Sequence, residues 1–243
     1  MDKALWITWY DLPDDRRDEY LAWLHGEYMP RLLGRPGVLW AAHYAAEHQP
    51  QQTTKKKPRR HPPAGSAPGG YHYILIVGAT HAHVFAQPVP RDYHAALPAH
   101  ERALLALRSG ESMNVMVEEA RTEGLDTSHR KPDVALSPCI QLGRFMHDDD
   151  EELLKWYAQW RLPSMTQMPG CVGVRKLVSV AGWAKHAILQ EFVSLEIRNR
   201  NFVDHERKNH PDKAEWSEKV TGMVLHGPGS PTVACRIASV VKN

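Results

Sequence analysis

Histidines and tyrosines that could transfer protons are concentrated in the first half of this 243-residue chain. Tyr10 and His43 stand in stretches rich in β-branched and aromatic residues, and His25 and Tyr28 stand in a stretch with helical spacing. An imidazole titrates near neutral pH and can act as general acid or base, whereas a phenol, with a pKa of about 10, is better suited to polarising a carbonyl. These four residues are our candidate catalytic residues, with His43 first because a strand would hold it rigidly.

Other residues near these positions could contact a bound compound. Thr8 shares one face of its expected strand with Tyr10, because side chains alternate along a strand. A tryptophan needs both burial and a partner for its N–H, and the wall of a binding site can provide the two. The candidate substrate contacts are Thr8, Trp23, Glu27, Trp160 and Arg161. The alternative for each of them, and for a strand histidine, is a purely structural role.

No metal site is expected. His81 and His83 would place two imidazoles on one face of an extended segment, but no carboxylate or cysteine stands at a companion spacing. The three cysteines, Cys139, Cys171 and Cys235, have no C-x-x-C spacing. We expect them to be reduced thiols of a cytoplasmic protein.

The chain contains a tandem repeat. Trp23–Tyr44, WLHGEYMPRLLGRPGVLWAAHY, corresponds to Trp156–Leu177, WYAQWRLPSMTQMPGCVGVRKL. The offset is constant, with 156 − 23 = 133 for the tryptophans, 163 − 30 = 133 for the prolines and 170 − 37 = 133 for the glycines of the Pro-Gly pairs. Matched residues of rare types in one ungapped register indicate a duplication.

The two copies differ in their polar residues. At the positions of Tyr10, His25, Glu27, Tyr28 and His43, the second copy has Gly143, Ala158, Trp160, Arg161 and Lys176. The proton-transferring types therefore belong to the first copy, which predicts one working site and one structural half. On this basis His43→Ala should lower kcat roughly 10²–10⁴-fold with little change in Tm, whereas Lys176→Ala should not lower kcat.

Each copy reads as strand, helix, strand, strand, helix, strand, the ferredoxin-like βαββαβ arrangement. Strands are expected at 5–10, 38–44, 71–77 and 112–120, and again at 139–145, 171–177, 187–193 and 232–240. Helices are expected from about 14 to 33, 98–107, 151–165 and 211–224, with a kink at Pro30. The predicted class is α+β, with one unit over residues 1–125 and a second over residues 137–243.

A basic, proline-rich segment interrupts the first unit. Gln49–Gly70 contains five lysines and arginines and no acid, so removing it changes the net charge from +2 to 2 − 5 = −3. It offers no large aliphatic residue for burial, and we expect a disordered, solvated loop whose shortening by about 19 residues leaves Tm within a few degrees. Neither nucleic acid nor a membrane is an expected partner, because the remaining chain has no basic face and no run of about 18 apolar residues.

The repeated motif resembles a family pattern. Trp-x-x-x-Glu-His-x-Pro followed by a Pro-Gly pair entering a strand is similar to the dimeric α+β barrel superfamily, in its EthD-like small-molecule branch. Trp23, Glu27 and Pro30 match, but Tyr28 stands at the histidine position, and the second copy has Trp160 and Arg161 in place of Glu-His. The resemblance implies two ferredoxin-like sheets closed into one barrel, here within a single chain. A mechanism that depends on the family histidine is not carried over.

The resemblance also implies a range of activities. Relatives include polyketide cyclases, quinol-forming monooxygenases, muconolactone isomerases and tandem haem proteins similar to chlorite dismutase. A haem would need a proximal histidine in the second unit, where the candidates are His147, His186, His205, His210 and His226. None of these stands in a recognisable motif, and no cofactor is expected.

We therefore expect a small-molecule enzyme of catabolic or secondary metabolism, acting on an apolar or aromatic compound by cofactor-independent acid–base chemistry as an isomerase, cyclase or lyase. If the face of Thr8, Tyr10 and His43 lines the barrel interior, these residues would orient the substrate there. The alternatives are a non-catalytic barrel that binds a hydrophobic ligand and a haem-binding tandem barrel. A homo-oligomer of this chain is compatible with the sequence.

Overall fold

The computed structural model describes residues 1–47, 59–130, 135–209 and 211–242, and its strands form a closed antiparallel barrel. The order β7-β6-β4-β1-β3-β2-β9-β5 closes through the pairing of β5 with β7, and β8 is added at the edge of β5. The strands are β1 (Ala4–Asp11), β2 (Val38–Ala46), β3 (Tyr73–Ala79), β4 (Ser109–Glu123), β5 (Cys139–His147), β6 (Cys171–Ala181), β7 (His186–Phe192), β8 (Val224–His226) and β9 (Thr232–Val241).

Two ferredoxin-like sheets make up this barrel. The first unit supplies β4-β1-β3-β2 and the second supplies β9-β5-β7-β6, which is the same order in each. The sheets join at two seams, where β2 pairs with β9 and β4 pairs with β6, so the fourth strand of each unit pairs with the second strand of the other. The predicted fold class, an α+β chain of tandem ferredoxin-like units closed into one barrel, is confirmed.

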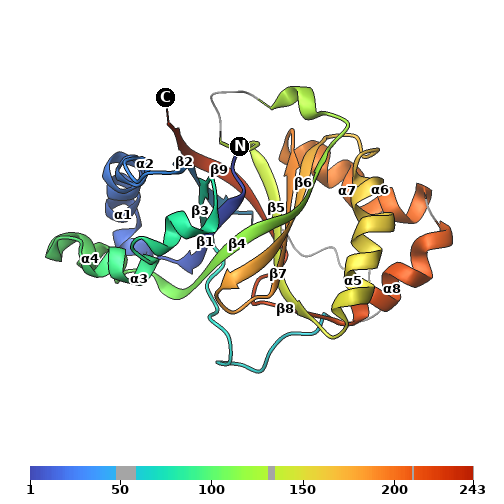
Figure 1. Ribbon diagram of the computed structural model, residues 1–243, viewed down its shortest axis with the longest axis horizontal. Helices are drawn as coiled ribbons and strands as arrows, with labels where there is room; N and C mark the ends of the chain where they lie inside the picture. Colours follow the sequence, from blue (N-terminus) through green and yellow to red (C-terminus); the bar gives the residue numbers. More distant parts are fainter. Residues whose placement is uncertain (48–58, 131–134, 210, 243) are drawn as a thin grey trace.

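Helices cover the barrel on two opposite sides (Figure 1). The first unit carries α1 (Arg17–Trp23), the π-helical turn η2 (Leu24–Tyr28), α2 (Met29–Leu33), α3 (Pro90–Ala95) and α4 (Ala99–Leu105). The second carries α5 (Asp150–Trp156), the π-helical turn η5 (Tyr157–Arg161), α6 (Leu162–Met165), α7 (Leu195–Asn209) and α8 (Ala214–Gly222). Short 3₁₀ turns are η1 (Asp14–Arg16), η3 (Ala82–Ala86), η4 (Thr127–His129) and η6 (Pro211–Lys213). Among the described helices, none has the length and apolar character needed to cross a membrane.

The repeated proline explains the π-helical turns. In η2 the N–H of Met29 bonds to the carbonyl of Leu24, five residues earlier, and Pro30 follows directly. In η5 the N–H of Leu162 bonds to the carbonyl of Tyr157, just before Pro163. A proline has no N–H for the usual bond and its ring crowds the carbonyl four residues back, so one wider turn relieves the helix. The predicted kink at Pro30 is therefore a π turn within a continuing helix.

The two faces of β1 belong to different cores. Leu5, Ile7 and Trp9 point into the barrel, whose interior is packed with apolar side chains. Trp6 and Tyr10, on the other face, pack against α1 and α2 of the first unit. The face that carries Thr8, Tyr10 and His43 therefore lies against the helices, so the condition under which these residues would orient a substrate in the barrel interior is not met. Both faces of β1 are buried, which is why alternation alone did not distinguish them.

The basic segment is not a free loop over its described part. Residues 48–58 lie outside the described residues, but residues 59–70 contact the second unit. The carbonyl of Arg60 accepts from His226 N (2.9 Å), and its guanidinium pairs with Asp148. Gly70 O accepts a hydrogen bond from Arg144 Nη2 (3.0 Å). The prediction of disorder is wrong for residues 59–70, because polar and backbone contacts hold a segment that buries no large aliphatic group. Shortening the loop by 19 residues would remove part of these contacts, so an unchanged Tm no longer follows.

Both Pro-Gly turns need their glycine. Gly37 has φ +83°, and an added Cβ would lie 2.5 Å from Val84 Cγ2. We expect Gly37→Ala to lower the free energy of unfolding by about 1–3 kcal/mol, because of the left-handed backbone and the clash. Gly26→Ala is the control, since a Cβ added at Gly26 would have nothing within 4 Å and alanine favours a helix. Chemical denaturation measures both variants; equal stabilities would contradict the argument.

Candidate proton-transfer site

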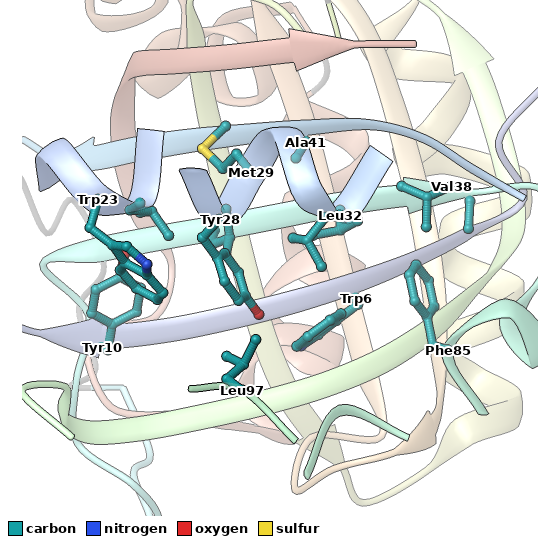
Figure 2. Packing of buried hydrophobic residues seen from close by; sticks show 14 of the residues in the cluster. Trp6, Tyr10, Trp23, Tyr28, Met29, Leu32, Val38, Ala41, Phe85 and Leu97 are labelled. Carbon is teal, nitrogen blue, oxygen red and sulfur yellow. The ribbon is translucent and has the colours of Figure 1, made fainter. Parts of the chain in front are cut away.

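The layer between the first sheet and its helices holds a cluster of aromatic and polar side chains. Figure 2 shows Trp23, Tyr28 and Leu32 of the helical segment lying against the strand that carries Trp6 and Tyr10. All five side chains are buried. The polar groups described below lie inside or at the margin of this apolar layer, where their charged forms are disfavoured.

Three of the predicted catalytic residues form one hydrogen-bonded chain. Tyr10 Oη lies 2.7 Å from His43 Nε2, and His43 Nδ1 lies 2.8 Å from His25 Nε2. His43 is 0% exposed, whereas His25 in η2 is half-buried. The chain therefore runs from the buried strand face to a residue that solvent reaches. His43 is therefore shielded from any bound compound, and His25 is the member of the chain that solvent reaches.

The protons of this chain can be assigned in two directions, and we take the one in which the Tyr10 hydroxyl is donated to Tyr20, its other hydrogen-bond partner. In this direction Tyr10 Oη accepts the Nε2–H of His43. His43 Nδ1 then carries no proton and accepts the Nε2–H of His25. In this arrangement Nδ1 of His25 carries no proton and is a base. A buried partner that fixes the tautomer of a catalytic imidazole is a recurring arrangement in enzymes.

Burial keeps both imidazoles neutral. It lowers the pKa of His25 below the usual 6.5. The pKa of His43 is lowered further, first by burial and then by the charges of His25 and Arg108. At neutral pH His25 is therefore in the form that accepts a proton.

Arg108 closes the inner end of the chain. Its Nε donates to Tyr20 Oη (2.6 Å), its Nη1 pairs with Glu111 (2.8 Å), and its guanidinium carbon lies 4.6 Å from the centre of the Tyr10 ring. Burial disfavours the cation, but Tyr20, Tyr10 and Glu111 raise the pKa of Arg108 above its usual value. Burial raises the pKa of both tyrosines, so neutral phenols lie against a fixed positive charge.

Tyr28 belongs to a second, separate pair. Its hydroxyl lies 2.7 Å from Nε2 of His94, a residue of α3, and Tyr28 is 0% exposed. Burial, followed by the charge of Arg108, lowers the pKa of His94 to about 4. The hydroxyl that was predicted to polarise a substrate carbonyl is thus occupied by an internal partner.

The predicted substrate contacts do not converge on one place. Thr8 is buried on the same strand face as Tyr10, and Glu27 is exposed on η2. The indole of Trp23 donates to Glu101 Oε2 (3.1 Å), a carboxylate that Arg31 also binds. Trp160 and Arg161 lie in the helix layer of the second unit, on the other side of the barrel. They cannot share a site with His25.

The sequence prediction missed four polar residues that lie between the first sheet and its helices: Tyr20, His94, Glu101 and Arg108. Tyr20 could have been found, because positions 20, 24 and 28 lie on one helix face. The other three come from the segment after β3, and nothing in their spacing connects them to the repeat.

The helix layer of the second unit also contains a polar cluster, at the position that corresponds to His43 in the first unit. Lys176, the counterpart of His43, is 1% exposed. Its Nζ contacts Glu119 Oε2 (3.0 Å), His186 Nδ1 (3.0 Å) and the Leu177 carbonyl (3.3 Å), and His186 Nε2 lies 2.8 Å from Asp150 Oδ1. Three acceptors satisfy the three donors of the ammonium. We interpret this cluster as a structural ion network across the β4–β6 seam.

Three of the described histidine candidates, His147, His186 and His205, do not fit a haem site, and the ring of the fourth, His226, lies beside the rings of His61 and Phe145. His147 and His186 each use both ring nitrogens, and Nε2 of His205 lies 2.8 Å from the Ser164 carbonyl. The layer around them is filled by a packed cluster that includes Trp156 and Trp160, whose indoles both donate to Ser217 Oγ. His210 lies outside the described residues. We therefore derive no step through haem.

Solved structures share this fold over the whole chain. A proposed monooxygenase from Fusobacterium nucleatum is 9% identical, with a TM-score of 0.58, covering 100% of this chain and 95% of the other. An anthrone oxidase-like protein is 6% identical, with a TM-score of 0.60 and coverages of 99% and 93%. A proposed chlorite dismutase is 12% identical, with a TM-score of 0.51 and coverages of 100% and 96%. No family model and no curated protein matches the chain by sequence. At these identities the comparisons show the dimeric α+β barrel fold alone.

Proposed function

We propose that the chain is a small-molecule enzyme of catabolic or secondary metabolism, of the EthD-like kind, that removes a proton from an apolar aromatic compound. His25 is the base, and His43 and Tyr10 position it. The observation that carries the proposal is the chain of Tyr10, His43 and His25, with contacts of 2.7 and 2.8 Å leading from a fully buried to a half-buried group. A structural imidazole pair would not need its outer member at the surface.

The surroundings of His25 favour an apolar substrate. Leu21, one turn earlier in α1, and Tyr73, whose ring stacks on His43 with centroids 5.6 Å apart, are both half-buried apolar groups on this face. Such surfaces favour flat hydrophobic compounds over ions.

The chemistry is a proton transfer at carbon. His25 Nδ1 takes a proton from an acidic C–H, and the electron pair of that bond moves to an adjacent carbonyl to give an enolate. The imidazolium then returns the proton to another carbon, which is an isomerisation or cyclisation, or to a leaving group, which is a lyase reaction. Each outcome needs a base at this position and no bound cofactor.

A barrel that only binds a hydrophobic ligand is the competing function. The packed barrel interior counts against it, because Ile7, Trp9, Trp40 and Ile76 already occupy that space. The surface around His25 could bind without reacting, and the experiment must separate the two.

Deuterium exchange tests the proposal without knowledge of the natural substrate. Polycyclic ketones with an acidic benzylic C–H, such as anthrone, are incubated anaerobically with the protein in D₂O, and deuterium uptake is followed by mass spectrometry. We expect uptake faster than in buffer alone, and loss of the excess rate in His25→Ala. Thermal stabilisation by such compounds with no faster exchange in any of them would support binding and refute the enzyme.

A further inference from the structure

Two of the three cysteines lie directly opposite each other in the barrel. Cys139 of β5 and Cys235 of β9 are paired in the antiparallel register. Arg236 N donates to the Pro138 carbonyl (2.8 Å), and a bond between these flanking residues marks the cysteine pair as a non-hydrogen-bonded pair. In such pairs the Cα atoms are about 4.5 Å apart and the side chains are close. That separation lies within the range of disulfides, about 4.4–6.8 Å.

The two thiols interact. As register partners, both side chains point to the same face of the sheet, and each thiol shifts the pKa of the other. Cys139 is buried against the helices of the second unit, and Cys235 is half-buried. An oxidant can therefore reach the pair through Cys235.

The third cysteine cannot take part. Phe192 of β7 is the register partner of Cys139 on one side and of Cys171 on the other. Cys139 and Cys171 are thus two strands apart, which is about 10 Å. Because disulfides do not form beyond about 7 Å between Cα atoms, one pairing alone is allowed.

We propose that Cys139 and Cys235 form a redox modification site, a cross-strand dithiol that a hydroperoxide converts to an intramolecular disulfide. The Cys235 thiolate attacks one peroxide oxygen, so an S–O bond forms and the O–O bond breaks; hydroxide leaves from hydrogen peroxide, or alkoxide from an organic hydroperoxide, and takes up a proton. The Cys139 thiolate then attacks the Cys235 sulfur, so the S–S bond forms and the sulfenic oxygen leaves as water. In total two thiols and one hydroperoxide give a disulfide, water and the corresponding alcohol or a second water.

The disulfide would cross-link β9 to β5 next to the seam between the two units. Residues 232–235 of β9 pair with β5, and residues 234–241 pair with β2 of the first unit. Cys235 lies where β9 passes from one partner to the other, so a disulfide there ties the seam strand to the second unit. A disulfide between residues 139 and 235 closes a long segment of the chain, so we expect it to raise Tm by about 5–10 °C.

The pKa values of the two thiols set the rate of their oxidation. Burial raises the pKa of Cys139 to about 12, and burial with the neighbouring Glu47 carboxylate raises the pKa of Cys235 to about 11. The thiolate is scarce at neutral pH, and its fraction rises about tenfold per pH unit below these values. Oxidation should be slow at pH 7 and markedly faster at pH 9.

The test uses the full chain, reduced and then treated with hydrogen peroxide at pH 7 and pH 9. We expect non-reducing peptide mapping to find a Cys139–Cys235 link, a free Cys171, and a higher Tm that a reductant reverses. Cys171→Ser should give the same link, and Cys235→Ser should give no intramolecular disulfide. A link that includes Cys171, disulfide-bonded dimers, or sulfinic acid at Cys235 without a link would each overturn the proposal.

Discussion

Replacing His25 by alanine is expected to lower kcat on the substrate roughly 10²–10⁴-fold, the usual effect of losing a positioned base. The fold should tolerate the change, because His25 is half-buried at the outer end of its chain. His100→Ala is the matched control, since His100 is an exposed histidine of α4. Steady-state kinetics with the compound found by deuterium exchange would measure both variants. A His25→Ala enzyme with normal kcat would place the base elsewhere.

The pH profile gives an independent readout. Because burial lowers the pKa of His25 below 6.5, the neutral base predominates at neutral pH. Activity should fall only as the pH drops through this lowered pKa, which gives kcat/KM an acid limb on the low side of 6.5. Residual activity of the His25→Ala enzyme should lack that limb. An acid limb unchanged by the substitution would belong to another group.

Tyr10→Phe separates positioning from structure. It removes the hydroxyl that bonds to His43 and keeps the buried ring in place. We expect a smaller loss of kcat than for His25→Ala and a displaced acid limb, because His43 then holds the His25 tautomer less firmly. His43→Ala is a poorer probe than the sequence implied, since it leaves a cavity in a fully buried place and removes one of the two hydrogen-bond partners of Tyr10.

The tandem fold was predictable because the repeat carries its own structural constraints. Pro30 and Pro163 occupy equivalent places after the π turns, and Gly37 and Gly170 both have positive φ, at +83° and +87°. Residues that a backbone demands are retained in both copies, and a constant offset exposes them. Helices α3 and α7 and strand β8 were missed, because they come from segments with no counterpart in the matched register.

The site was only partly predictable. Tyr10, His25 and His43 were selected as proton-transferring types, and the structure joins them in one chain. Their orientation was not readable, since β1 has large residues on both faces and both faces are buried. Partners such as Arg108 and His94 come from distant positions through tertiary packing, which periodicity within one segment cannot reveal.

The largest expected loss of stability comes from Asp2, at the seam between the two units. Arg121 of β4 and Arg175 of β6 are register partners, so two guanidiniums face each other across the seam. Like charges in this position repel, and the Asp2 carboxylate binds both of them. Arg175 is 4% exposed and Asp2 is 7% exposed, so little solvent screens the cluster. Glu118 also pairs with Arg121 (2.6 Å), so Arg175 is the guanidinium that depends most on the Asp2 carboxylate.

Asp2→Ala should lower the free energy of unfolding by about 3–5 kcal/mol, because it leaves Arg175 as a buried charge without its partner. For a chain of this size the corresponding fall in Tm is roughly 6–20 °C. Asp14→Ala is the control, because the Asp14 side chain is 92% exposed in its pair with Arg17 and should change stability little. The double variant Asp2→Ala with Arg175→Met should recover much of the loss, since it removes the unpaired charge.

The same carboxylate gives a pH signature. Burial alone would raise the pKa of Asp2, but the charges and hydrogen bonds of Arg175 and Arg121 outweigh burial and lower it below the usual 3.8. A lowered pKa in the folded state means that the contribution is complete above about pH 4 and is lost as the pH falls through the lowered value. The Tm difference between the wild-type chain and Asp2→Asn should therefore be constant near neutral pH and shrink below about pH 4. A difference that does not shrink at all as the pH falls below about 4 would show that packing, and not the charge of Asp2, holds the seam.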